Sequence, residues 1–414
     1  MRRWRSATGR TVAIVALAAL GAAGCTSSRS NAGASPGGQH SPSQHRPISS
    51  PDVISSGAAP TSDSPPPSAS PSTLPAGPVG SSSPVPAVDA DPLPGMPPIL
   101  DSHNIYAADT PGNFTAAARR AKPLVYVPDT LSNDVYVIDP ATKKVVDHFP
   151  VGRLPQHVVP AYDGSVLWVT DDRGNSLTPI DPTTGKPGKP VTVEDPYNLY
   201  FTSDGRFGIV IAEALRRLDF RDPHTMALKH SLPVPMCSGV DHADFSANGR
   251  LMLLSCEFAG AGNKPGRLLK VDVARQQVTG TIDLPNNASP QDVKLSPDGS
   301  TSYVADLHYG GVWLIDATTL KRLGFLHTGA GAHALYASRD AKNLYVSDRD
   351  AGAVSVISFA TNKVVATWRI PGGGSPDMGN VSADGKALWL SGRRQRRGLR
   401  LRHHHRTGHQ DPGW

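Results

Sequence analysis

The sequence predicts an all-β chain built from repeated units of four strands. A short apolar phrase recurs at intervals of 42, 41, 44, 50, 42 and 44 residues by subtraction, and it begins at Tyr126, Trp168, Ile209, Leu253, Tyr303, Tyr345 and Trp389. Between the phrases, period-two alternation and turns such as Pro297-Asp298-Gly299 are typical of half-buried strands joined by tight turns. A period of this size indicates a repeat architecture, and no segment has a sustained helical period.

The repeated units resemble the YVTN-family β-propeller repeat of YncE-like bacterial cell-envelope proteins, in which a tyrosine-valine-threonine-asparagine phrase opens the second strand of a blade. The resemblance covers about residues 124–392 and implies a seven-bladed β-propeller of four-stranded blades, with the last blade incomplete. The first phrase has no innermost strand before it, so the ring needs a returning strand to close. The fourth position of the phrase is usually aspartate here, at Asp129, Asp171, Asp306 and Asp348. We interpret these aspartates as turn caps, whose carboxylates accept backbone N–H groups two residues further on.

Residues 1–25 predict a lipoprotein signal peptide. Four arginines form a basic head before Thr11, an apolar run continues to Leu20, and small residues lead to Cys25. The ending, Ala22 to Cys25, resembles the lipobox of bacterial lipoproteins, in which the cysteine becomes the lipidated first residue of the mature chain. This resemblance implies a lipid anchor in the cell membrane that faces the extracytoplasmic side. An ordinary cleaved signal is the alternative.

Residues 26–97 predict a disordered linker. The segment is rich in Ser, Pro, Ala and Gly, and it buries too little apolar surface to offset the entropy of ordering it. A pre-propeller segment, residues 98–123, follows. Within it, residues 101–107 with Ile105-Tyr106-Ala107 are a candidate edge strand that could substitute for one strand of the ring.

After Gly392 the repeat pattern gives way to an aberrant basic tail, residues 393–414. A functional basic tail is one interpretation. We favour a frameshift, because permitted codons for Arg394 to Arg406, read one nucleotide later, encode GNDGVYVFDTTTG, which matches the repeat at 311–319. A frameshift would remove the third and fourth strands of the last blade and the closing strand of the first.

The net charge does not indicate a nucleic-acid partner. The tail carries seven Arg and one Asp, a net charge of +6 that equals the value for the whole chain. The signal peptide holds four more arginines, so residues 26–392 have a net charge near −4 by subtraction. We therefore expect no nucleic acid among the partners of this protein.

Polar residues recur where the innermost strands begin, at the expected mouth of the central channel. Aligned on the Asp-Gly turns, the units place Gln156, Tyr197, Asp241, Gln291, His333 and Asp377 in one column, and His157, Asn198, His242 and Asp292, with Ala334 and Met378, in the next. Polar groups that converge in a concave site predict binding, here of a small molecule or a cell-envelope protein. The alternative is that these residues are solvated and cap strand ends.

A metal or haem site built from His157, His242, His333, Asp241 and Asp292 is a more specific alternative, because imidazole and carboxylate suit a first-row transition metal. We expect side chains on opposite blades to lie too far apart to share one ion, and the sequence has no C-x-x-C-H motif. The sequence therefore predicts no cofactor and no metal ligands.

The leading functional hypothesis is a surface-tethered binding or scaffold module of the cell envelope. One alternative is a hydrolase similar to lactonase propellers of the phosphogluconolactonase type, and another is a haem- or metal-linked protein of electron transfer or cofactor maturation. No nucleophile, base and orienting residue recur at a fixed spacing, so no catalytic residue is assigned and enzymatic activity is left open.

Cys237 and Cys256 are the only cysteines after Cys25. Outside the cytoplasm, such a pair is a candidate disulfide. Cys237 precedes an expected innermost strand and Cys256 ends the expected second strand beside it. The sequence leaves the pairing of these two thiols open.

Overall fold

The computed structural model describes residues 100–101, 103–393 and 399–402. The predicted signal peptide, the linker and most of the basic tail lie outside these residues, so their predicted properties stay predictions. In the part of the chain that is described, no helix is long and apolar enough to cross a membrane.

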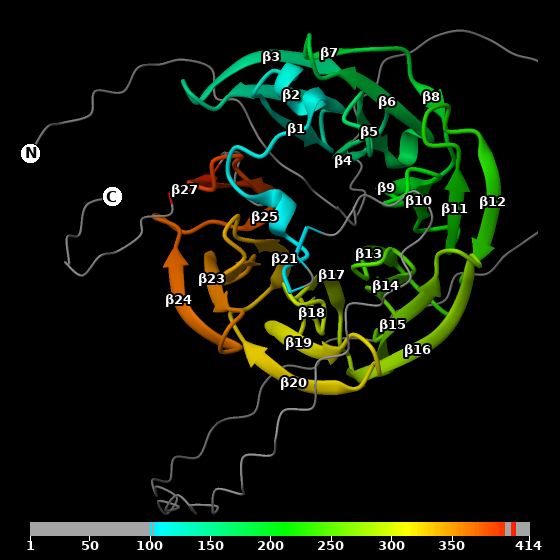
Figure 1. The fold of residues 1–414 in the computed structure, drawn as a ribbon, viewed down its shortest axis with the longest axis vertical. Helices are drawn as coiled ribbons and strands as arrows, with labels where there is room; N and C mark the ends of the chain where they lie inside the picture. Colours follow the sequence, from blue (N-terminus) through cyan, green and yellow to red (C-terminus); the bar gives the residue numbers. More distant parts are fainter. Residues whose placement is uncertain (1–99, 102, 394–398, 403–414) are drawn as a thin grey trace, which may run out of the picture. The chain divides into compact units, whose positions relative to one another are not determined.

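The described residues form two three-stranded sheets, four four-stranded sheets and one five-stranded sheet, with antiparallel pairing throughout. Figure 1 shows these sheets following one another around a ring. The prediction of an all-β propeller with four-stranded antiparallel blades is confirmed. The two three-stranded sheets, β1-β2-β3 and β25-β26-β27, are the first and the last along the chain.

Every sheet except β1-β2-β3, which begins with a second strand, runs outward from an innermost strand near the centre of the ring (Figure 1). The innermost strands are β4 (Pro155–Pro160), β9 (Pro196–Phe201), β13 (Val240–Phe245), β17 (Pro290–Leu295), β21 (Ala332–Ala337) and β25 (Pro376–Val381). The second strands are β1 (Val125–Asp129), β5 (Leu167–Asp171), β10 (Gly208–Ala212), β14 (Leu251–Cys256), β18 (Thr301–Asp306), β22 (Asn343–Asp348) and β26 (Ala387–Gly392). Every repeated phrase therefore forms a second strand.

The remaining strands complete the blades toward the rim. The third strands are β2 (Asp134–Asp139), β6 (Ser176–Asp181), β11 (Arg217–Arg221), β15 (Pro265–Asp272), β19 (Gly311–Asp316), β23 (Ala353–Ser358) and β27 (Leu399–Arg402). The outer strands are β3 (Lys144–Pro150), β7 (Lys186–Pro187), β8 (Val191–Thr192), β12 (Leu228–Pro233), β16 (Gln277–Asn286), β20 (Arg322–His327) and β24 (Lys363–Arg369). A short 3-10 helix, η2 (Asp172–Gly174), joins β5 to β6.

The core lies between neighbouring sheets. All six residues of β18 are buried, whereas the outer strand β12 is mostly exposed. Val304, Trp313 and Ile315 of one sheet pack with Leu253 and Leu268 of the sheet before it. Because the second strands are covered on both faces, their sequences are continuous apolar runs.

Two of the four phrase-ending aspartates cap turns as predicted. The Oδ1 atom of Asp129 accepts a hydrogen bond from the backbone N–H of Leu131 at 2.9 Å. The Oδ1 atom of Asp306 accepts one from the N–H of His308 at 3.0 Å. Both bonds reach two residues along the chain, which is the geometry of an Asx turn.

For the other two aspartates the turn-cap prediction is wrong. Asp171 accepts a hydrogen bond from the Thr178 hydroxyl at 2.7 Å, and Asp348 accepts one from the Ser355 hydroxyl at 2.7 Å. Both hydroxyls lie on third strands, so these carboxylates tie two strands together. Burial raises the pKa of Asp348 to about 6, although the hydroxyl hydrogen bonds act in the opposite direction.

The prediction of an edge strand at residues 101–107 is also wrong. This segment leads into a 3-10 helix, η1 (Ala107–Asp109), and then into α1 (Ala116–Arg120). It crosses the end of the ring where the innermost strands finish, since Ile105 N donates to Pro297 O at 2.8 Å and the Tyr106 hydroxyl donates to Leu295 O at 2.6 Å. Figure 1 shows it in cyan over the centre of the ring.

The last sheet differs from the prediction in one strand. The frameshift hypothesis expected the third strand of this blade to be lost, but β27 pairs with β26, with Leu401 opposite Leu388 and Leu399 opposite Leu390. In the printed sequence, leucines alternate with arginines over these residues, and the sequence encoded in the shifted frame alternates in the same way. Both sequences therefore have the period of two that is typical of a strand. Among the described residues this blade has no fourth strand and remains incomplete.

Candidate functional site

The polar columns predicted at the channel mouth occupy the second and third positions of the innermost strands. The ten residues at these strand positions are Gln156, His157, Tyr197, Asn198, Asp241, His242, Gln291, Asp292, His333 and Asp377. The mouth therefore lies at the start of these strands, at the opposite end of the ring from Tyr106 and the crossing segment.

A β-bulge at the start of the innermost strands explains how neighbouring residues both reach the mouth. The pairing register shifts between Val240 and Ala243 in β13, and between Pro155 and Val158 in β4. A bulge places two residues opposite one and re-aims their side chains. The displaced N–H of His242 is satisfied by the Ser255 hydroxyl at 3.0 Å.

Seven of the ten residues are buried, which excludes the alternative of solvated caps for those seven, whereas Gln156, His157 and Tyr197 are half-buried. Asp241 is 1% exposed, His242 2%, Asp377 2% and His333 3%. A buried polar group is costly unless it is hydrogen-bonded. The hydrogen-bond partners of these buried side chains therefore determine what the mouth can bind.

Asp241, His242 and Tyr197 form one hydrogen-bonded group. The Oδ1 atom of Asp241 accepts hydrogen bonds from the Tyr197 hydroxyl and from His242 Nδ1, both at 2.7 Å. Burial lowers the pKa of His242, but the charge of Asp241 and the hydrogen bond outweigh it and raise the pKa to about 9. His242 is therefore an imidazolium at neutral pH. Its Nε2 and the Oδ2 of Asp241 are buried and have no hydrogen-bond partner among the described residues.

His157 lies beside this group in the opposite protonation state. Its ring centroid is 5.4 Å from those of both His242 and Tyr197, in edge-to-face contact. Its Nδ1 donates to the backbone carbonyl of Tyr197 at 2.9 Å. Burial, and then the positive charge of His242, lower the pKa of His157 to about 4, so it is neutral at pH 7.

A second group surrounds Asp377 on the other side of the mouth. Arg349 Nε donates to Asp377 Oδ1 at 2.7 Å, and the Arg349 guanidinium also contacts His333. Burial, and then the charge of Arg349, hold the pKa of His333 well below its usual value. His333 is therefore neutral, and its ring centroid lies 6.1 Å from that of His242.

Three of the other predicted residues make hydrogen bonds to the backbone. Asp292 accepts the backbone N–H of Leu335 from the next blade at 2.8 Å. Asn198 accepts the N–H of Leu199 at 2.8 Å, and Gln291 donates to the backbone carbonyl of Ser289 at 3.2 Å. Asp292 therefore joins two blades, and its charge also interacts with that of His242. Asn198 and Gln291 bond residues next to them along the chain.

The predicted side-chain set does not form a metal centre. The three histidines come closer together than the blade spacing suggested, but their rings meet edge to face in a row. Across the described ranges, no cluster of three or more His, Cys, Asp or Glu side chains has a geometry that could hold a metal ion.

The sequence reasoning missed a third column, formed by the residue that directly follows each repeated phrase. The members of this column are Thr130, Asp172, Glu213, Glu257, Leu307, Arg349 and Arg393. The sequence contains the signal for this column, because each of these residues lies one position after the end of a repeated phrase. Three consecutive blades supply carboxylates, and the two last blades supply guanidinium groups.

The carboxylates of this column have raised pKa values, and burial is the main cause in each case. The pKa of Glu213 rises to about 8 and that of Glu257 to about 7, with the charge of Asp241 as the second cause for both. The pKa of Asp172 rises to about 6, with Asp195 as its second cause. We call these three residues the acidic arc. Perturbed pKa values of this kind cluster at functional sites.

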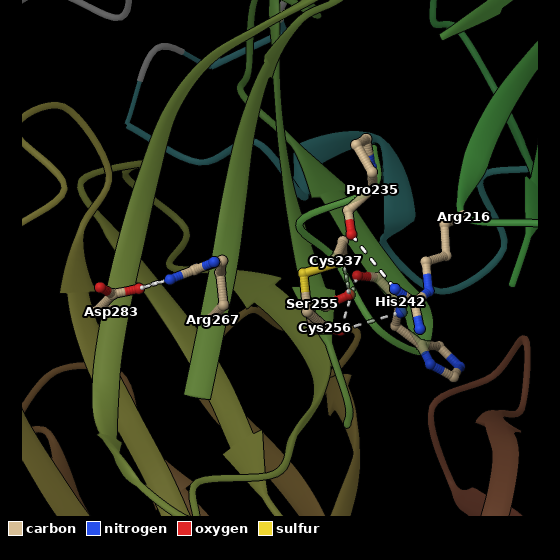
Figure 2. Close-up of a disulfide and its surroundings, with 8 residues drawn as sticks. All are labelled: Arg216, Pro235, Cys237, His242, Ser255, Cys256, Arg267 and Asp283. Atoms are coloured by element: carbon tan, nitrogen blue, oxygen red, sulfur yellow. Dashed lines mark hydrogen bonds and ion pairs between the residues drawn. A yellow bond between two sulfur atoms is a disulfide. The ribbon is translucent and has the colours of Figure 1, made fainter. Parts of the chain in front are cut away.

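The disulfide candidate is realised next to the mouth. Cys237 and Cys256 are bonded, and the bond joins the loop before β13 to the end of β14 (Figure 2). Figure 2 shows His242 beside Ser255, the residue before Cys256. The disulfide thus restrains the chain on both sides of the strand that carries Asp241 and His242.

Comparison with known proteins identifies the fold. The model of the YNCE-like beta-propeller family matches residues 96–404. No curated protein matches this chain. Among solved structures, the chain is similar to one titled Kuenenia stuttgartiensis Hydrazine Synthase, with a TM-score of 0.61, 17% identity, and coverage of 69% of this chain and 93% of that one. At this identity, the likeness extends to the fold alone.

The paired protonation states of the mouth can be tested by NMR. We expect His242 to titrate near pH 9 and His157 near pH 4 in spectra of ring-labelled protein. Asp241→Asn should lower the pKa of His242 below 6.5, because burial then acts without its counter-charge. Asp283→Asn, on the outer strand β16, is the matched control and should change neither value.

The raised pKa of His242 also predicts how the stability of the folded protein depends on pH. The folded pKa of His242 lies above its unfolded value of 6.5, so its contribution to stability is complete below about pH 6.5 and is lost as the pH rises through about 9. Urea unfolding of the native chain and of Asp241→Asn at pH 6.5 and pH 9 measures this contribution. A His242 that is neutral at pH 7 would contradict the assignment.

Proposed function

The chain belongs to the YNCE-like β-propeller family, and we propose that it is a binding protein of the cell envelope that holds a small, charge-separated ligand at the channel mouth. The observation that carries this proposal is the pair of unpartnered, buried polar atoms on Asp241 and His242, in a mouth lined by groups of both charges. A ligand that hydrogen-bonds these atoms would remove the cost of leaving them unpaired.

The charge distribution supports a ligand with a cationic and an anionic end. Glu213 and Glu257 of the acidic arc interact electrostatically with Asp241 on one side of the mouth. Arg349 and Arg393 interact with Asp377 on the other side. A cation placed near the acidic arc would lower the pKa of its carboxyl groups and favour their charged form. A carboxylate or similar anion at the other end would approach the two guanidinium groups.

The preference for binding over hydrolysis follows from the same geometry. The Asp241–His242 pair resembles the base and orienting residue of a hydrolytic site, but at neutral pH His242 is already protonated and cannot accept a proton. Of the described hydroxyls, Ser255 is the one bonded to His242, through the backbone N–H and carbonyl, and not through the imidazole. This arrangement supplies no activated nucleophile.

Ligand binding can be tested by thermal shift and calorimetry. The panel consists of free amino acids and short peptides as zwitterions, with matched amines and carboxylic acids that carry one charge. We expect a zwitterion to raise the melting temperature and Glu213→Gln or Asp241→Asn to weaken its binding at least tenfold, because each removes a carboxylate from the cationic subsite. Asp283→Asn should bind as the native chain does.

Two outcomes would contradict this proposal. One is that single-charge compounds bind as tightly as the zwitterions, or that Glu213→Gln leaves the affinity unchanged. The other is lactone hydrolysis that is abolished by His157→Ala or His242→Ala, which would favour the hydrolase alternative.

We further propose that the protein is anchored through a lipid on Cys25 and held away from the membrane by residues 26–97. The lipobox-like sequence before Cys25 and the Ser- and Pro-rich composition of the linker support this proposal. Labelling cells with an alkyne fatty acid should mark the native protein, and Cys25→Ser should abolish the label and release the protein from the membrane fraction. Equal membrane retention of Cys25→Ser would contradict a lipid anchor.

For the C-terminus we propose a frameshift after residue 392 in a seven-bladed ring, with the sheets β1-β2-β3 and β25-β26-β27 counted as separate blades. Its support is the repeat phrase encoded one nucleotide out of frame for Arg394 to Arg406. The DNA sequence across these codons tests it. If no single shift restores a strand pattern, the basic tail belongs to the native protein.

A further inference from the structure

A further cavity lies at the mouth end of the ring, beside the acidic arc. It has a volume of about 530 Å³ and lies between the three blades that begin with β13, β17 and β21. Its walls come from the loops that follow the second strands of these blades and from the loops that precede the innermost strands. Ligand pockets in proteins have volumes of roughly 300–1,000 Å³. The cavity, which we call the side pocket, therefore has room for part of a small ligand.

The side pocket adjoins the charged groups of the mouth through Glu257. This residue of the acidic arc lines the pocket, and its carboxyl group interacts electrostatically with Asp241 and with the guanidinium of Arg349. Arg393 also interacts electrostatically with Glu257. Interactions between charges weaken as the distance between them grows. The side pocket is therefore next to the place where the cationic and anionic subsites of the mouth meet.

An apolar residue separates the two kinds of charge in the third column. In three consecutive blades, the residue directly after the repeated phrase is Glu257, then Leu307, then Arg349. Leu307 is half-buried and lines the side pocket, and its side chain has no polar atom. A ligand with an ammonium group near Glu257 and a carboxylate near Arg349 would therefore pass Leu307, with the apolar part of the ligand next to the side pocket.

The walls of the side pocket suit an apolar group. The ring of Phe258 lines it and is 49% exposed, and the methyl groups of Ala261, Ala288 and Ala330 line it as well. Covering an exposed aromatic ring with an apolar group is favourable, because it removes apolar surface of both partners from water. The small alanine side chains leave space for a flat ring or a branched alkyl group.

Three polar side chains of the walls already have partners within the protein. The Asn287 amide donates to the side-chain oxygen of Asn263 at 3.1 Å, and the Ser289 hydroxyl accepts a hydrogen bond from the Gln291 amide at 3.2 Å. The His308 ring lies edge to face against the ring of the next residue, with 5.5 Å between the centroids. A ligand therefore has no need to supply hydrogen bonds to Asn287 or Ser289, and apolar contact is what these walls offer it.

Backbone hydrogen bonds hold the walls in place, so the side pocket is preformed. The N–H of Leu307 donates to the carbonyl of Ser289 at 3.0 Å, and the N–H of Asp350 donates to that of Ala330 at 3.0 Å. Gly331 allows the second approach, since a Cβ atom there would lie 2.7 Å from the backbone nitrogen of Asp350, and its φ of +77° favours glycine. A preformed pocket loses little conformational entropy when it binds.

We propose that the side pocket binds the apolar side chain of the ligand held at the mouth, and that this ligand is a free α-amino acid with an aromatic or branched aliphatic side chain. The inference rests on the proposed function, because Glu257 and Arg349 must attract the ammonium and carboxylate groups. An α-amino acid carries both charges and its side chain on one carbon atom. This matches an acid, an apolar wall and a guanidinium on three consecutive blades.

Calorimetry on the full chain tests this inference with four probes: glycine, L-phenylalanine, phenethylamine and 3-phenylpropanoate. We expect L-phenylalanine to bind at least tenfold tighter than glycine, because the side pocket buries its ring. Phe258→Ala should weaken the binding of L-phenylalanine at least tenfold more than that of glycine. Leu215→Ala is the matched control, since Leu215 is an exposed loop residue of the preceding blade and lies outside the side pocket. It should change neither affinity.

A second variant keeps the test decisive if Phe258→Ala fails to fold. Ala330 is an exposed loop residue whose side chain lines the side pocket. In Ala330→Trp the indole should fill the side pocket, and the binding of L-phenylalanine should weaken at least tenfold more than that of glycine.

The outcomes separate this inference from the proposed function. Equal binding of glycine and L-phenylalanine, with no difference between them in either variant, would overturn the inference and leave the zwitterionic ligand standing. Binding of phenethylamine or 3-phenylpropanoate as tight as that of L-phenylalanine would overturn both. If none of the four probes binds, the α-amino acid is overturned as the ligand, and the short peptides of the earlier panel then test the proposed function alone.

Discussion

The burial of every second strand between two neighbouring sheets is the constraint on which the rest of the structure depends. All residues of β10 and β18 are buried, so these strands tolerate apolar or fully bonded side chains only. Charged residues consequently lie at the last position of these strands, as Asp306 does in β18, or just beyond them. Asp172, Glu213 and Glu257 follow their second strands directly, and Asp241 and His242 lie in a bulge at the start of β13. The burial of the second strands thus accounts both for the apolar core and for the position of the polar residues at the mouth.

The sequence predicts the fold and the columns well because both depend on local periods. The repeat interval and the Asp-Gly turns fix which residue begins each innermost strand, and this was sufficient to place Asp241, His242 and His333 at the mouth. The pairing of Asp377 with Arg349 was not predictable in the same way. It joins residues 28 positions apart on two blades, and such contacts depend on the curvature of the ring, which strand periods do not specify.

The wrong predictions for residues 101–107 and for the aspartates of the repeated phrase have local physical causes. Residues 104–107 contain apolar side chains, but Asn104 accepts the N–H of Tyr106 at 3.0 Å and starts a turn, which outweighs β propensity. Asp171 and Asp306 occupy the same repeat position, yet their partners differ. Asp171 has the hydroxyls of Ser176 and Thr178 within reach, whereas Asp306 bonds the indole N–H of Trp313 and turn amides. Identical positions acquire different roles through the residues opposite them.

An apolar groove between β1 and the strands β25 and β26 shares residues with the polar mouth. Gln156 and His157, from the mouth columns, also line the apolar groove, and so does Met378. His157 therefore belongs to both places, since its ring also contacts those of Tyr197 and His242. Linkage requires that any coupling between two binding sites be reciprocal: if a ligand in the groove changes the affinity of the mouth by some factor, the ligand of the mouth changes the affinity of the groove by the same factor. Any ligand of the groove that shifts the His157 ring would therefore change the mouth as well, and the ligand of the mouth would act back on the groove through the same ring.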